Sequence, residues 1–197
     1  MNFIFITRCY KPDNLAKVKQ SVQDVFKDSE HTYKHLIVVD MTHGQTLDAF
    51  HDFCDDNTCV VFVTRKPDGD TQMMQGMDEA LKEEHDDDAY VFVLDDDNLL
   101  HPDFLSVCDE CHGEDAVIFK IENKLHLGGY EILDKYPVGH IDWANYITKL
   151  STMKRIKIYH TDGPARCEDG VFFDHMKRNN CTFKFVNRVL AYYNKLR

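Results

Sequence analysis

The sequence predicts an α/β protein with a mostly parallel central sheet flanked by helices and a mixed C-terminal part. Over residues 3–98, strand-like apolar runs alternate with helical patterns, an order typical of parallel sheets with right-handed crossovers. The run at 90–94 is wholly apolar and ends in three aspartates, which indicates a strand buried on both faces. After residue 98 the regular alternation stops.

Four strands and three helices are expected to alternate in the first half. The strands are runs rich in β-branched and aromatic residues, and they cover 3–7, 35–40, 59–64 and 90–94. The first helix follows Pro12, which can open a helix, and its apolar residues recur at helical spacing up to Phe26. Shorter helical patterns follow at 47–53 and 71–84. Each strand–helix unit has about 30 residues, the usual length of a βαβ unit.

The second half mixes both kinds of element. We expect strands at 116–122, 124–133, 155–160, 183–186 and 189–193, and helices at 102–107, 142–150 and 168–178. The helix at 142–150 is predicted because Trp143, Tyr146, Ile147 and Leu150 are spaced to share one face. The helix at 168–178 begins with acidic residues, which suits the helix dipole. No linker or repeat interrupts the chain, so a single domain over residues 1–197 is expected.

The composition is that of a globular protein and argues against two classes of function. With 197 residues, of which 43% are hydrophobic, the chain is long enough for a full core. The net charge of -11 argues against nucleic acid as a partner, because a phosphate backbone is bound by clustered Lys and Arg. No apolar run has the length of a transmembrane segment, and the apolar start is too short for a signal peptide. We expect a cytoplasmic protein, with peripheral contact at a membrane left open.

The seven cysteines are expected to be reduced thiols, since no secretory signal is recognised. The run from Cys108 to His112 has the spacing of a haem attachment site, but that chemistry needs export. As a zinc half-site the run lacks a second Cys-x-x-Cys pair. We interpret it as the end of a helix that carries two free thiols.

Three aspartates directly follow the apolar run at 90–94. Ligands of open α/β sheets bind beyond the carboxyl ends of the strands, so Asp95, Asp96 and Asp97 lie where a ligand is expected. On an extended backbone, Asp95 and Asp97 point to the same side. Two carboxylates on one side suit Mg²⁺ or Mn²⁺ bound to a substrate diphosphate. The alternative is a solvated acidic turn, such as the second aspartate run at 86–88.

Four motifs together resemble the inverting family 2 glycosyltransferases, which have the GT-A fold. Residues 3–10 resemble the opening strand and loop that face the nucleobase, and 36–40 resemble the second strand, which ends in an acid that bonds the base. Residues 91–97 resemble the strand and DxD motif, and 167–173 resemble the Glu-Asp motif that carries the catalytic base. The family's Asn-x-Gly motif is matched here only in its glycine, Gly76.

The resemblance implies a role for each matched residue. The nucleotide sugar is expected to contact Thr7, Arg8, Tyr10, Asp40, Gly76, Asp95 and Asp96. The metal ligands implied are Asp97 and Asp95, and His160 is a candidate for the third. Asp169 is implied as the general base, with Glu168 as its neighbour or substitute. Trp143 and Asp142 are candidates for contact with the acceptor. The alternatives are a cap or turn acid for Asp40, a core side chain for Trp143 and a helix N-cap for Asp142.

These roles imply a metal-dependent glycosyltransferase, with a UDP-sugar as the expected donor and a glycan, lipid-linked or other hydroxyl as acceptor. Residues 1–98 would form the nucleotide-binding half and 99–197 the acceptor-binding half. Two alternatives stay open. A nucleotidyltransferase would carry a Gly-rich basic signature after the first strand, and residues 7–12 hold no glycine. A non-catalytic nucleotide- or metal-binding module would tolerate the loss of Asp169.

Overall fold

A computed structural model describes residues 1–10, 12–41, 47–63, 77–78, 80–84, 86–123, 141–156 and 168–197. The strand expected at 124–133 lies outside these residues, as do Gly76, His160 and the first part of the helix expected at 71–84. Of that helix, residues 77–78 and 80–82 are helical.

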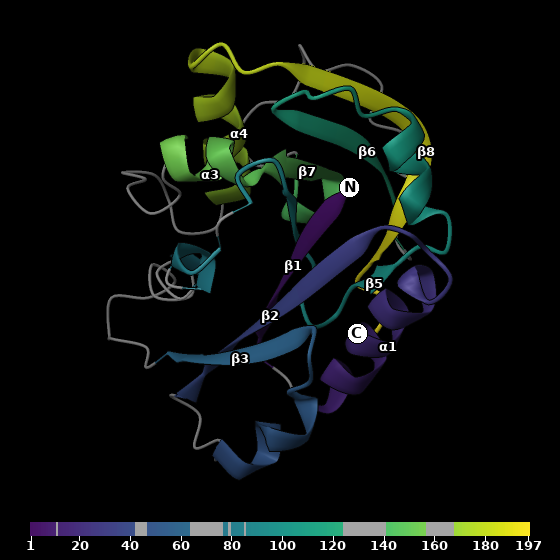
Figure 1. Cartoon of the computed structure of the whole chain (residues 1–197), viewed down its shortest axis with the longest axis vertical. Helices are drawn as coiled ribbons and strands as arrows, with labels where there is room; N and C mark the ends of the chain where they lie inside the picture. The colour runs from purple at the N-terminus through teal and green to yellow at the C-terminus, as the bar shows by residue number, and fades with distance from the viewer. Residues whose placement is uncertain are drawn as a thin grey trace.

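An eight-stranded sheet runs through both halves of the described chain in the order β3-β2-β1-β4-β7-β6-β8-β5 (Figure 1). Its strands are β1 (Asn2–Cys9), β2 (Thr32–Asp40), β3 (Thr58–Val63), β4 (Tyr90–Val93), β5 (Leu99–Leu100), β6 (Ala116–Asn123), β7 (Tyr146–Lys149) and β8 (Phe183–Tyr193). The strands β1 to β4 pair in parallel. β7 is antiparallel to both β4 and β6, β8 is parallel to β6, and β5 is antiparallel to β8. The predicted α/β class, with its parallel first half and mixed second half, is confirmed.

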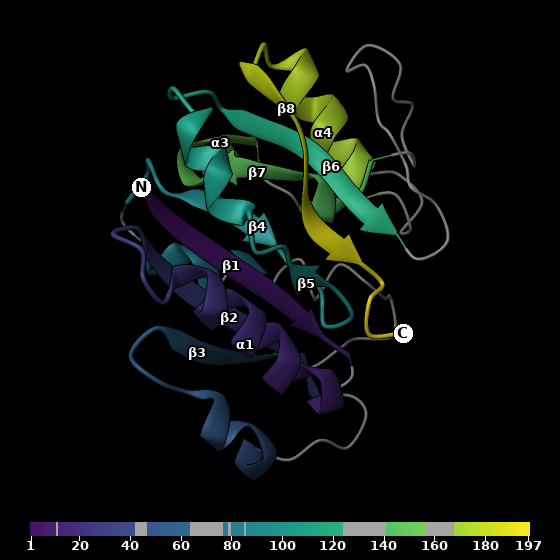
Figure 2. The same ribbon diagram turned by 90° about the vertical axis from the view of Figure 1, so that its right-hand side faces the viewer.

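Helices cover both faces of this sheet (Figures 1 and 2). The α-helices are α1 (Leu15–Phe26), α3 (Leu150–Ile156) and α4 (Glu168–Arg178). On one side of β1, Phe3 and Phe5 pack in a core with the apolar face of α1. On the other side, Ile4 and Ile6 share a core with the buried residues of α3 and α4. The alternation of side chains along a strand therefore places β1 at the centre of two hydrophobic layers.

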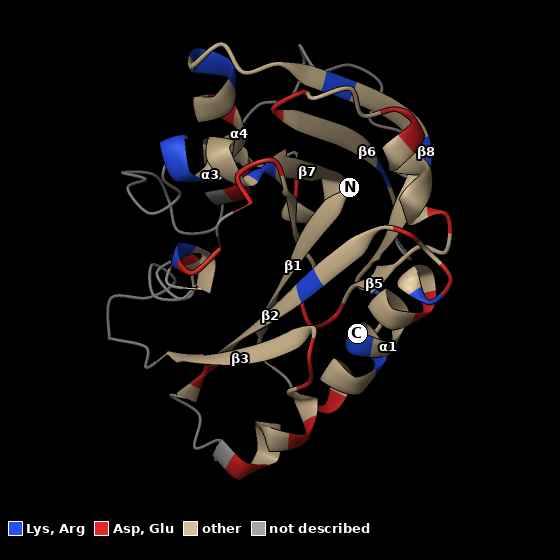
Figure 3. Cartoon of the chain, viewed as in Figure 1, with Lys and Arg blue, Asp and Glu red and all other residues tan. Residues whose placement is uncertain are grey.

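The helices are short, and basic side chains gather in the last turns of α3 and α4, where they complement the helix dipole (Figure 3). The short helices expected at 47–53 and 102–107 are 3₁₀ helices. They are η3 (Leu47–Phe53) and η4 (Phe104–Asp109). The structure also describes the 3₁₀ helices η1 (Pro12–Asn14) and η6 (Trp143–Asn145). In the part of the chain that the structure describes, no helix has the length and apolarity needed to cross a membrane.

The prediction of a helix at 142–150 is wrong. Asp142 caps η6 instead, and the chain then extends as β7 between β4 and β6. Tyr146, Ile147 and Thr148 are all buried and are aromatic or β-branched, residues that favour strands. Because β7 is buried on both faces, it lacks the apolar–polar alternation that marks a half-buried strand.

Two other predicted elements differ from the structure. Arg155 belongs to α3 rather than to a strand at 155–160, and residues 157–160 lie outside the described residues. The two strands expected at 183–186 and 189–193 are one strand, β8. Its pairing with β6 is interrupted near Lys120, since Phe119 pairs with Val186 and Lys120 with Val189. Two residues of β8 are skipped there, and a third is skipped before Ala191, which pairs with Ile121. This irregularity explains the break in the sequence pattern.

Candidate active site

An ion pair between Arg8 and Asp95 joins the carboxyl ends of β1 and β4. The Arg8 guanidinium donates from Nε to Asp95 Oδ1 and from Nη2 to Oδ2, both at 2.6 Å. The two side chains are only 15% and 19% exposed. Burial opposes the charge of Arg8, but the Asp95 carboxylate outweighs burial and raises the Arg8 pKa. A bidentate ion pair of this kind is among the stronger polar contacts in proteins, so it holds the carboxyl ends of β1 and β4 together.

The acidic run forms a tight turn rather than an extended segment. The Asn98 backbone N–H donates to the Asp95 carbonyl at 3.0 Å, which closes the turn. Asp96 Oδ2 accepts the Tyr10 backbone N–H at 2.6 Å, and Asp97 Oδ2 accepts Arg197 Nε at 2.5 Å. The premise that placed Asp95 and Asp97 on one side of a strand is therefore wrong. Each of the three carboxylates has its own partner.

Thr7 lies inside the protein. Its hydroxyl donates to the Leu94 carbonyl at 2.8 Å and is 2.8 Å from His35 Nε2. The only hydroxyl proton is used toward Leu94, so His35 carries its proton on Nε2 and donates it to Thr7. Thr7 is 0% exposed, and this contradicts the expected contact of its side chain with a nucleobase. Thr7 instead supports the strand end from which the acidic turn starts.

Asp40 and Tyr10 lie at the carboxyl ends of β2 and β1, at the same edge of the sheet as the ion pair. Asp40 ends β2 and is 1% exposed, so its carboxylate lies within the protein. Tyr10 follows β1 in the loop, and 37% of it is exposed. An aromatic ring exposed beside a buried ion pair is available to a planar ligand. Of these two residues, Tyr10 therefore has the more accessible side chain.

A second carboxylate group faces the ion pair from the other half of the chain. Asp169 stands in the first turn of α4, and its Oδ1 accepts the Gly170 backbone N–H at 2.7 Å. Burial, followed by the charge of Asp142, raises the pKa of Asp169 to about 7, although Arg8 acts to lower it. Burial therefore determines the direction of this pKa shift, although a helix start favours the charged form of a carboxyl.

Asp142 connects this group to the end of β8. Its Oδ1 accepts the Ala144 backbone N–H at 2.9 Å, as an N-cap does, and its carboxylate also hydrogen-bonds the Tyr193 hydroxyl. Burial, and then the backbone N–H and the Asp95 charge, act on the Asp142 carboxyl, whose pKa is raised overall. Asp95, Asp142 and Asp169 therefore interact through their charges around the guanidinium of Arg8.

Trp143 is a core residue. It is 3% exposed, and its ring lies 5.2 Å from the Phe172 ring and 5.6 Å from the Tyr146 ring. This burial contradicts the expected stacking of Trp143 on an acceptor. Gly76 and His160 lie outside the described residues, and so does the side chain of Glu168.

Three residues of this region were not expected from the sequence. Tyr193 and Arg197 reach the site because β8 pairs with β5, which directly follows the acidic turn. Tyr146 donates its hydroxyl to the Asp169 carbonyl at 3.2 Å. No local motif marks these residues, since their contacts arise from the pairing of distant strands.

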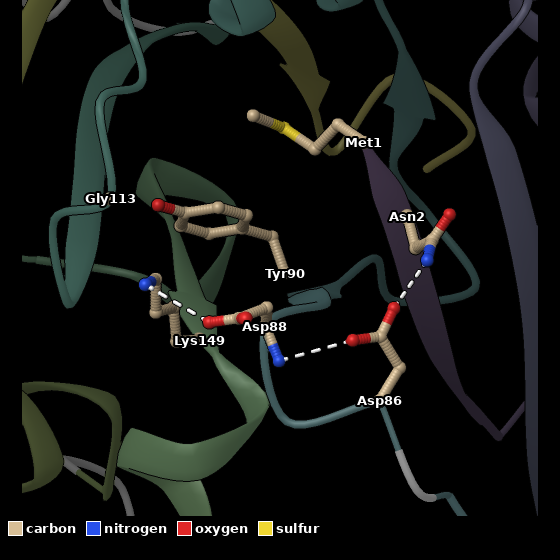
Figure 4. A pocket seen from close by; sticks show the side chains of 7 residues that line it. All are labelled: Met1, Asn2, Asp86, Asp88, Tyr90, Gly113 and Lys149. Carbon is tan, nitrogen blue, oxygen red and sulfur yellow. Dashed lines mark hydrogen bonds and ion pairs between the residues drawn. The ribbon is translucent and has the colours of Figure 1, made fainter.

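Two cavities lie at the opposite, amino-terminal edge of the parallel strands. The first, of about 480 Å³, is lined by Met1, Asn2, Asp86, Asp88, Tyr90, Gly113 and Lys149 (Figure 4). The second, of about 410 Å³, shares Asn2 and Asp86 with it. In the first, the polar groups engage one another, since Lys149 pairs with Asp88 and Asp86 accepts from Asn2 and from the Asp88 backbone. We therefore assign the candidate active site to the carboxyl edge, around Arg8 and Asp95.

The sequence matches no protein-family model and no curated protein sequence. Its fold is similar to that of S. aureus TarS, a glycosyltransferase. A crystal structure of a TarS fragment aligns over 98% of this chain and 60% of the TarS chain, with a TM-score of 0.69 and 18% identity. The complex of that fragment with UDP-GlcNAc gives a TM-score of 0.70 at 17% identity, over 98% of this chain and 58% of the other. Its complex with UDP gives 0.65, also at 17%, over 98% and 60%.

This chain thus spans about 60% of the length of the TarS fragment that it matches. At such low identity the likeness shows the fold. The chain therefore has a GT-A-like fold, as its sequence motifs predict.

Proposed function

We propose that this protein is a glycosyltransferase that moves a sugar from a UDP-sugar to an acceptor hydroxyl, with inversion at the anomeric carbon and with a divalent cation. One observation carries the proposal. The Asp169 carboxyl, with its pKa raised to about 7, lies within electrostatic reach of the Arg8–Asp95 pair at the carboxyl edge of the sheet. In open α/β folds this edge is where nucleotides bind. An ionisable group with a shifted pKa beside a ligand-binding edge is typical of a catalytic acid or base.

The nucleotide would lie across the ends of β1, β2 and β4. We assign the exposed ring of Tyr10 to the nucleobase. Asp40, which is buried, stays a prediction from the sequence for the same part of the donor. Asp95 and Asp96 lie next to the expected position of the ribose and diphosphate, with Arg8 holding Asp95 in place. Gly76 stays a prediction from the sequence for this subsite. The TarS complexes with UDP-GlcNAc and UDP support a uridine nucleotide as the one to test first.

The residues of the acidic turn fit a divalent cation. In nucleotide sites Mg²⁺ is commonly held by one or two carboxylates together with phosphates and water. Asp97 would supply one of them, and Asp95, whose two oxygens engage Arg8, stays a prediction from the sequence as the second. The carboxylates of Asp95 and Asp97 pair with guanidinium groups in this structure, so the acidic turn already binds positive charge. No group of three or more His, Cys, Asp or Glu suited to a metal occurs in the described ranges. When bound, Mn²⁺ or Mg²⁺ would act as a Lewis acid toward the leaving diphosphate. His160 stays a predicted third ligand.

Asp169 would remove the proton of the acceptor hydroxyl. As the acceptor oxygen forms its bond to the anomeric carbon, the bond from that carbon to the diphosphate oxygen breaks, and the hydroxyl proton passes to the Asp169 carboxylate. Attack from the face opposite the diphosphate inverts the configuration. A base with a pKa near the working pH is the efficient choice for this step. Glu168 stays a predicted neighbour or substitute, and Asp142 sets the charge around the base rather than contacting the acceptor.

A transfer assay with Asp169→Asn tests this proposal. We expect kcat to fall by about 10²- to 10⁴-fold, while the affinity for the nucleotide changes by less than about twofold. Asp174→Asn is the matched control in the same helix, since Asp174 makes a surface ion pair with Arg178 at 2.7 Å. Full activity of Asp169→Asn would refute the role of the base. Release of pyrophosphate from a nucleoside triphosphate and a sugar phosphate would indicate a nucleotidyltransferase instead.

A further inference from the structure

The segment 194–197, which follows β8, docks on the acidic turn. The Leu196 backbone N–H donates to the Asp97 carbonyl at 3.0 Å, and the Asn194 N–H donates to Asn98 Oδ1 at 2.8 Å. Arg197 Nε donates to Asp97 Oδ2 at 2.5 Å. Two backbone donors and one guanidinium thus join segments that are distant in the sequence. The expected metal ligand is covered by a cation of the same chain.

The two partners of the Asp97–Arg197 pair differ in exposure. The Asp97 side chain is 12% exposed, whereas the Arg197 side chain is 64% exposed. Arg197 can therefore leave toward solvent with little loss of packing, and the two backbone hydrogen bonds would still hold the segment in place. Arg8 cannot replace it, because both oxygens of Asp95 engage the Arg8 guanidinium. Among the residues that the structure describes, Asp97 thus pairs with the Arg197 cation, which is the more easily released partner.

We propose that Arg197 is a diphosphate-binding residue that pairs with Asp97 as long as no metal or nucleotide is bound. A divalent cation and the guanidinium compete for the negative charge of the same carboxylate, so binding of the metal would release Arg197. A diphosphate then brings new negative charge to the same place, and a guanidinium suits phosphate oxygens well because it donates two parallel hydrogen bonds. This inference rests on the proposed function, and it adds a donor-binding residue from the far end of the sequence.

The inference predicts that a single variant binds Mn²⁺ more tightly and UDP more weakly than the wild type. In Arg197→Gln, Mn²⁺ alone should bind about three- to tenfold more tightly than in the wild type, because its competitor is gone. UDP added with saturating Mn²⁺ should bind about tenfold more weakly, because a charge-assisted contact to phosphate is lost. Free Mn²⁺ is measured by electron paramagnetic resonance, and UDP binding is measured by calorimetry. Lys195→Gln is the matched control.

The control removes the same charge from the same segment. Lys195 Nζ lies 4.6 Å from the centre of the Tyr192 ring, so both affinities should change by less than about twofold. An unchanged Mn²⁺ affinity in Arg197→Gln would overturn the inference, and so would a loss of both affinities, which would indicate a structural role. If the wild type binds neither Mn²⁺ nor UDP, the proposed function fails first, and this outcome is distinct from both.

Discussion

Asp169→Asn should stabilise the protein at high pH while it removes activity. Burial raises the pKa of Asp169 from the usual 3.8 to about 7. Below pH 3.8 both the folded and the unfolded chain hold this proton. As the pH rises from about 4 to about 7, the unfolded chain releases it first, so the wild type loses stability across this window. The shift of roughly three units corresponds to an upper limit of about 4 kcal/mol.

Asparagine keeps the oxygen that accepts the Gly170 N–H and carries no charge at any pH. Because Asp169 is partly open to solvent, we expect a gain of about 2 kcal/mol at pH 8.5 and about zero at pH 4. Urea unfolding at several pH values measures this difference, with Asp174→Asn as the control on the same helix. A difference that does not grow with pH, or that favours the wild type at pH 8.5, would refute the reasoning that Asp169 is held with a raised pKa.

Three further changes test contacts that hold the site or the sheet around it. Burial, followed by the charge of Lys19, lowers the pKa of His35 to about 4. The wild type should therefore lose up to about 3 kcal/mol of stability as the pH falls from about 6.5 to 4, and His35→Gln should abolish this dependence. Urea unfolding at pH 7 and 4.5 measures both. Arg8→Gln leaves Asp95 half-buried without its partner, so it should cost about 2–3 kcal/mol, and Arg8→Lys should cost less; denaturant melts rank the two. Asp115→Asn should cost about 1–3 kcal/mol, because Asp115 accepts from Thr152 Oγ1 at 2.6 Å and from the Thr182 N–H at 2.8 Å; an equal loss in the exposed Asp109→Asn would contradict this.

The elements that the sequence predicts well depend on local spacing. The helix expected at 168–178 matches α4 because its apolar residues recur at helical intervals within one segment. The strands β1 to β4 lie within a few residues of their expected ranges. The apolar runs of β1, β2 and β4 are buried on both faces, whereas β3, at the edge of the sheet, is partly exposed. The class of fold follows from the order of these elements.

The wrong predictions concern elements and contacts that depend on distant partners. The spacing of Trp143 and Tyr146 fits one face of a helix, and only the pairing of β7 with β4 and β6 makes that segment a strand. The same holds for the site. Asp95 is correctly placed at a strand end, but its partner Arg8 is far away in the chain. Arg197 is farther still, so no local pattern could assign it to Asp97.

The central claim is a metal-assisted nucleotide site at the acidic turn. Calorimetric titration of a panel of nucleoside diphosphates and nucleotide sugars, with and without Mn²⁺, on the wild type and on Asp97→Ala tests it most directly. The account predicts that UDP and a UDP-sugar bind in the presence of Mn²⁺ and that this binding is lost in Asp97→Ala. If no nucleotide binds, or if binding depends neither on the metal nor on Asp97, the acidic turn is only a paired strand end and the account is contradicted.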